Sequence, residues 1–139
     1  MAKGVYLSIE LIESKAFHSL TGTSKEILLH FLLKRTFAKK KINGKRPCTN
    51  HDRINFAYTE ARKKGFSQKR FTRSIDDLLA KGFISVVHPG GGFEKDKAVY
   101  SLLTEDGTSN KWALWHSGTV FERRQKDSIP RGFCNPKKV

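Results

Sequence analysis

The sequence predicts an α+β domain in which three helices form the core and a β-hairpin follows them. Three observations predict it. Two segments carry apolar residues at helical spacing, a very short glycine-containing turn separates two helices, and two alternating apolar segments flank three consecutive glycines. A chain of 139 residues fits one such domain. We expect residues 1–20 to form an N-terminal arm with a short helix, residues 21–104 the domain, and residues 105–139 a polar, basic C-terminal tail.

The first helix of the core is predicted in the segment TGTSKEILLHFLLKRTF. It follows a short strand or extended arm, in which Val5, Leu7 and Ile9 alternate, and one short helix. Thr23 with Glu26 matches a capping box, and Thr21 is the alternative N-cap. A stripe of apolar residues predicts a buried face, widened enough for burial on more than one side: Ile27, Leu28, Leu29, Phe31, Leu32 and Leu33.

A basic loop is predicted next, because an Asn-Gly pair and a proline interrupt the helical pattern between residues 38 and 52. Its cations are Lys39, Lys40, Lys41, Lys45 and Arg46. A solvated connector accounts for such a loop without any ligand.

The second helix is short. Ile54, Phe56 and Tyr58 alternate and favour a brief strand, after which Thr59 is expected to cap a helix that ends at Gly65. A single helix over residues 52–64 is the competing interpretation.

The third helix has the clearest signals. Ser67 is the expected N-cap, Gly82 the expected C-terminal stop, and the face between them is apolar through Phe71, Ile75, Leu78 and Leu79. Because only Gly65 and Phe66 separate it from the preceding helix, the pair is typical of a helix-turn-helix.

A β-hairpin completes the domain. Residues 83–87 and 99–103 read as its strands, and residues 89–97 as a tip that the glycines allow to turn sharply.

The charge indicates the partner. The chain has 27 Lys and Arg against 13 Asp and Glu, a net charge of +14. Such an excess favours a polyanion, with nucleic acid the first candidate and an anionic membrane surface the second. No segment approaches the roughly 18 apolar residues of a membrane span, so we expect no membrane-embedded part. The N-terminus lacks the apolar region of a signal peptide, and Cys48 and Cys134 lie far apart, which predicts a reducing cytoplasm.

The run FSQKRFTRSIDDLLAKGFISVVHPGGG resembles the recognition helix and wing of winged helix-turn-helix proteins. More narrowly, the chain is similar to small winged-helix proteins of bacteriophages and integrated elements, which share an opening like LSIELIESKAFHSLTG and a strand-helix pair like INFAYTEARKKGFS. The resemblance spans roughly residues 5–104. It implies a three-helix core with a hairpin wing, and binding to double-stranded DNA.

On the third helix, the expected DNA contacts begin at the N-terminal end. Lys69 and Arg73 point away from the core and Arg70 lies on the flank, while Ser67 and Gln68 occupy the first turn. Gln68 can read adenine, Arg70 or Arg73 can read guanine, and Lys69 suits a phosphate. Ordinary solvated side chains are the alternative. Asp76 and Asp77 oppose an all-basic face, although they lie in the half of the helix that usually leaves the groove.

Two further groups are expected to contact the DNA backbone. The first closes the second helix, where its charges also suit the helix dipole: Arg62, Lys63 and Lys64. The second is the hairpin tip, whose bare backbone can approach phosphates: Gly90, Gly91 and Gly92, with Lys95 and Lys97. A flexible hairpin loop with no ligand is the alternative for this tip.

No catalytic residue, metal site, cofactor or small-molecule substrate is predicted, because the five histidines are scattered and no ligand spacing occurs. We therefore expect a non-enzymatic DNA-binding regulator or accessory factor of a phage or mobile element. A replication-initiator domain and a winged-helix protein-interaction module remain the alternatives, and homodimerisation is left open. Trp112 and Trp115 could stack on the bases of a single strand, but we expect at least one of them to dock the tail onto the domain.

Overall fold

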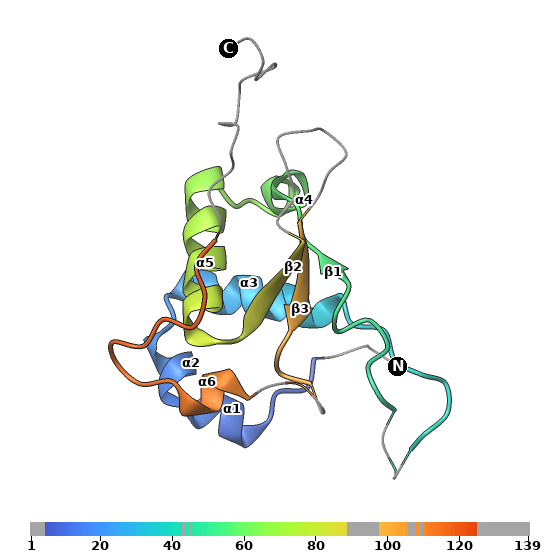
Figure 1. Ribbon diagram of the computed structural model, residues 1–139. Coiled ribbons are helices and arrows are strands. Elements are labelled where there is room, and N and C mark those ends of the chain that lie inside the picture. The colour runs from blue at the N-terminus through green and yellow to red at the C-terminus, as the bar shows by residue number, and fades with distance from the viewer. Residues whose placement is uncertain are drawn as a thin grey trace.

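The computed structural model describes residues 5–42, 44, 46–88, 98–105, 108 and 110–124. Within them the chain forms an α+β fold of helices around a three-stranded antiparallel sheet (Figure 1). The elements are, in chain order, α1 (Ile9–Glu13), α2 (Lys15–Ser19), α3 (Gly22–Leu33), β1 (Ile54–Asn55), α4 (Tyr58–Lys63), α5 (Gln68–Lys81), β2 (Ile84–His88), β3 (Val99–Leu102) and α6 (Lys111–Leu114).

The core lies where α3, α5 and the sheet meet. In Figure 1, α3 runs across the back of the sheet and α5 stands beside it. The ring of Phe31 from α3 is fully buried and makes edge contacts with Phe56 and Tyr100, at centroid distances of 5.2 and 5.5 Å. Phe56 also contacts Phe71 of α5, at 5.2 Å. Aromatic packing therefore joins the two long helices to strand β3.

Helix α3 is buried on fewer sides than the sequence predicts. Its N-cap is Thr21, whose Oγ1 accepts a hydrogen bond from the N–H of Ser24 at 3.1 Å, so the capping box at Thr23 is wrong. Leu29 and Leu33 are 37% and 58% exposed, so burial on more than one side is also wrong. The core covers one face of the helix, and the face carrying these two leucines is left to solvent.

From residue 5 to residue 20, the part of the N-terminal segment that the structure describes forms two short helices and no strand. Ser8 caps α1, and Ser14 both ends α1 and caps α2 by accepting from the N–H of Phe17 at 3.1 Å. The expected extended arm through Ile9 is therefore too long, because Ile9 already lies in α1. The serine at position 14 breaks the expected single helix by bonding locally to the backbone.

The strand-then-helix interpretation of residues 54–64 is confirmed, and the single helix is wrong. The N-cap of α4 is Ala57, which makes no side-chain cap hydrogen bond, so the expected cap at Thr59 is wrong. The helix begins before Thr59, at Tyr58, whose ring packs near that of Phe71 at 6.4 Å.

Helix α5 begins and ends where the sequence predicts. Ser67 Oγ accepts from the N–H of Arg70 at 3.2 Å, and Gly82 closes the helix with a left-handed φ of 84°. The α4–α5 turn uses a second left-handed glycine, Gly65, with φ of 97°, and buries Phe66. These two glycines set the angle between α4 and α5 and the exit of the chain toward β2.

Substitution of these glycines should have unequal effects. Both positions strain an L-residue by about 1–2 kcal/mol. At Gly82 an added Cβ would also lie 2.5 Å from Lys111 Cβ and 2.9 Å from the backbone nitrogen of Trp112, whereas at Gly65 it would meet nothing within 4 Å. We expect Gly82→Ala to lower the free energy of unfolding clearly more than Gly65→Ala does, as measured by urea denaturation. Equal losses would contradict this close approach of α6.

The sheet has the order β1-β3-β2, so β2 is an edge strand. Ile84 pairs with Leu102 and Val86 with Tyr100, and the register shifts between Val86 and His88. The predicted hairpin strands are confirmed, but the tip over residues 89–97, with Gly90, Gly91, Gly92, Lys95 and Lys97, lies outside the described residues. The ends of β2 and β3 nearest this tip lie at the same end of the molecule as α4 and the beginning of α5, whereas α1, α2 and α6 lie at the opposite end (Figure 1).

The tail packs on the domain as far as residue 124. Trp112 of α6 is buried, stacks on Phe83 with ring centroids 6.1 Å apart, and donates from Nε1 to the carbonyl of Leu103 at 3.2 Å. Trp115 is half-buried, with Nε1 donating to the carbonyl of Thr119 at 2.8 Å. The expectation that at least one tryptophan docks the tail is confirmed by Trp112.

Candidate nucleic-acid interface

A patch of exposed cations covers the end of α4 and the first half of α5. We call it the cationic surface, and its members are all exposed: Arg62, Lys63, Lys64, Lys69, Arg70 and Arg73. Ser67 and Gln68 lie between them and are also exposed. Only residues 65–68 separate these two groups of basic residues along the chain.

The phase of α5 explains why its cations point outward. Phe71, Ile75, Leu78 and Leu79 are buried in the core. Lys69 and Arg73 each lie two positions from Phe71, which places them about 160° from Phe71 around the helix. The same apolar pattern that anchors α5 therefore projects its basic side chains into solvent.

The positive charge of the cationic surface is not neutralised by ion pairs with described residues. Within the described part of the chain, none of its six members forms an ion pair. The nearby carboxylates are engaged elsewhere: Glu60 with Lys34 at 2.5 Å, Asp76 with Arg124 at 2.5 Å, and Asp77 with Lys81 at 2.6 Å. The positive potential of the surface is thus available to an anionic ligand.

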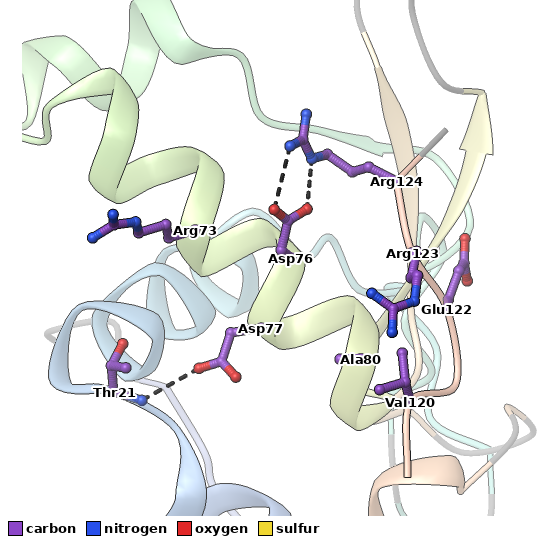
Figure 2. Close-up of a pocket in the computed structure, with 9 residues that line it drawn as sticks. All are labelled: Thr21, Arg73, Asp76, Asp77, Ala80, Val120, Glu122, Arg123 and Arg124. Carbon is purple, nitrogen blue, oxygen red and sulfur yellow. Dashed lines mark hydrogen bonds and ion pairs between the residues drawn. The ribbon is translucent and has the colours of Figure 1, made fainter. Parts of the chain in front are cut away.

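Asp76 and Asp77, the two acidic residues that oppose an all-basic face on α5, both have partners (Figure 2). Arg124 binds the Asp76 carboxylate through two nitrogens, with Nε at 2.5 Å from Oδ1 and Nη2 at 3.2 Å from Oδ2. Asp77 accepts from the backbone N–H of Thr21 at 3.3 Å, besides pairing with Lys81. Sequence reasoning missed the pairing with Arg124, because nothing local connects residues 48 positions apart.

The basic loop lies apart from this surface in sequence and is closed at its base. Phe37 and Cys48 form an isolated bridge, and Thr36 N donates to Asn50 Oδ1 at 2.8 Å. Its described cations are all exposed: Lys39, Lys40, Lys41 and Arg46. Burial raises the pKa of the Cys48 thiol, which disfavours the reactive thiolate.

No cluster of three or more His, Cys, Asp or Glu side chains could hold a metal ion in the ranges that the structure describes. None of the described helices is both long enough and apolar enough to cross a bilayer.

His30 supports the turn between α4 and α5. Its ring makes edge contacts with Phe56 at 6.3 Å and with Phe66 at 5.9 Å. Burial, followed by the nearby Lys64 charge, lowers the pKa of His30 below its ordinary value of 6.5. The folded state therefore favours the neutral imidazole.

A pH dependence of stability follows from this lowered pKa. The contribution of His30 is fully present above pH 6.5 and is lost as pH falls through the lower pKa of the folded state, because the unfolded chain binds the proton more readily. We expect His30→Gln to lose less stability than the wild type between neutral pH and pH 5, as measured by urea denaturation. The other histidines are common to both proteins, so an identical loss would contradict the assignment.

Comparison with protein-family models, with curated proteins and with solved structures finds no match for this chain.

Proposed function

We propose that this chain is a non-enzymatic double-stranded DNA-binding protein with a winged helix-turn-helix fold. The order α3, β1, α4, α5, β2, β3 and the three-stranded sheet support this assignment. The observation that carries it is the cationic surface, six exposed cations with no described ion-pair partner at the helix pair. An uncompensated basic surface on a helix-turn-helix is suited to phosphate and to base edges in the major groove.

The roles divide between sequence reading and positioning. The first half of α5 enters the major groove, where Gln68, Arg70 and Arg73 face base edges. Lys69 contacts phosphate, and Arg62, Lys63 and Lys64 hold the backbone beside the groove. The predicted contacts of Gly90, Gly91, Gly92, Lys95 and Lys97 with an adjacent segment of the DNA backbone stay part of this proposal.

The resemblance to winged-helix proteins of phages and integrated elements supports a role as a regulator or accessory factor of such an element. Binding to that element's own origin would instead indicate a replication initiator. A footprint over its promoters and its origin separates these two roles.

The salt dependence of duplex binding tests the proposed function. On a random-sequence duplex no base is read specifically, so we expect Arg70 and Arg73 to neutralise phosphates together with the other four cations. The slope of log affinity against log salt should then be about −5, which is a loss of about 10³-fold between 50 and 200 mM salt. Fluorescence anisotropy with a labelled random-sequence duplex measures it. Absence of duplex binding at 50 mM salt would reject the proposal.

A further inference from the structure

Residues 120–124 form a strap that lies along the outward side of α5. The N–H of Phe121 donates to the carbonyl of Ala80 at 2.9 Å, near the end of the helix, and Arg124 pairs with Asp76, one turn earlier. The strap therefore runs antiparallel to α5. Between the strap and the helix is a shallow hollow of about 580 Å³, into which Figure 2 looks.

The strap also contacts the edge strand. Glu122 Oε1 accepts from Ser85 Oγ at 2.7 Å, and its Oε2 accepts from the N–H of Val86 at 2.9 Å. Val86 is the last residue of β2 that packs against the core, since Val87 is 55% exposed and the register shifts at this point. The contact thus lies where the hairpin leaves the body of the protein.

We propose that Glu122 and Arg124 are positioning residues that connect strand β2 to the outward side of α5 and hold the β2–β3 hairpin at a fixed angle to that helix. Arg124 secures one end of the strap on α5, and Glu122 secures the strap on β2 three residues beyond the α5–β2 turn at Gly82 and Phe83. The core alone fixes β2 only as far as Val86.

The expected effect of this positioning role on duplex binding rests on the proposed function. The hairpin and the first half of α5 must meet the same duplex, and a hairpin already fixed at the correct angle loses less entropy on binding. The strap covers the side of α5 near Asp76 and Ala80, whereas Lys69 and Arg73 stay exposed. It therefore orients the interface without covering the basic half of the helix.

The sign of the effect of Glu122 on DNA affinity distinguishes positioning from electrostatics. Removing a carboxylate should strengthen binding to a polyanion if charge alone matters. We expect Glu122→Ala instead to weaken duplex binding by about tenfold. Glu122→Gln, which keeps an oxygen for the N–H of Val86, should bind at least as tightly as the wild type.

Glu13→Ala is the matched control, because Glu13 is an exposed carboxylate on α1, at the end of the molecule away from α4. It removes the same charge and should leave duplex affinity unchanged or slightly increased. Tightening by Glu122→Ala to the level of Glu122→Gln would overturn the positioning role. So would a fall in the thermal midpoint of Glu122→Ala with unchanged affinity of the folded protein.

A distance measurement on the free protein tests the positioning role of the strap in the absence of DNA. Spin labels on Gln68 of α5 and Val87 of β2, in a background with Cys48→Ser and Cys134→Ser, report the angle between helix and hairpin. We expect a narrow distance distribution that broadens with Glu122→Ala or Arg124→Ala and narrows again with Glu122→Gln. An unchanged distribution in Glu122→Ala would overturn the inference. Broadening in Glu122→Ala, combined with absence of duplex binding by the unlabelled wild type, would reject only the proposed function.

Discussion

Replacing Arg70 and Arg73 together by glutamate is expected to lower the affinity for duplex DNA by about 100-fold or more, because each arginine that reads a base contributes about 1–3 kcal/mol and each reversal adds repulsion. Both side chains are exposed and form no ion pair with a described residue, so the fold should not change. Fluorescence anisotropy at fixed salt measures the affinity, and circular dichroism verifies the fold.

The matched control is Lys39→Glu with Lys40→Glu in the basic loop, which changes the net charge by the same amount at two exposed positions. We expect this pair to weaken binding far less, since only long-range attraction is lost. Equal losses from the two double variants would show that net charge, and not the cationic surface, determines binding. If the Arg70 and Arg73 variant still captured a protein partner while losing DNA, the interaction-module alternative would gain support.

Phe31→Ala should be the most destabilising single truncation in the core. The ring is fully buried and contacts aromatic rings of two other segments, Phe56 and Tyr100. Removing it should lower the free energy of unfolding by about 3–5 kcal/mol. Since domains of this size are stable by only about 5–15 kcal/mol, the variant should be close to partial unfolding at room temperature.

Phe37→Ala provides the comparison, because it removes the same atoms from a ring that is 48% exposed. Its loss should stay below about 1 kcal/mol, as is usual for exposed positions. Urea denaturation gives both values. A loss below about 1 kcal/mol for Phe31→Ala would contradict its place at the centre of the core.

Local signals in the sequence predicted α5 well. A capping serine, a left-handed glycine and an apolar face all lie within the helix or next to it, so Ser67, Gly82 and Phe71 could be placed without knowledge of the rest of the chain. The first residue of α3 could not be predicted as well. Thr21 and Thr23 both suit an N-cap, and only the geometry of the preceding chain selects Thr21.

The outcomes that depend on distant contacts could not be predicted. Leu29 and Leu33 suit a buried face in their sequence pattern, but they are exposed because none of the described helices or strands covers them. The partners of Asp76 and Glu122 lie 48 and about 36 residues away, so neither the neutralised acid on α5 nor the strap was visible in the pattern. The residues of the candidate interface could therefore be named from the sequence, but the pairing of the carboxylates near them could not.

The most direct test of the central claim, that the cationic surface binds duplex DNA, is the mapping of backbone amide chemical shifts during titration with a short duplex. We predict that the largest changes fall on residues 62–73, across the end of α4 and the first half of α5, with smaller changes along β2. Changes confined to the basic loop, or to the end of the molecule formed by α1, α2 and α6, would contradict the account.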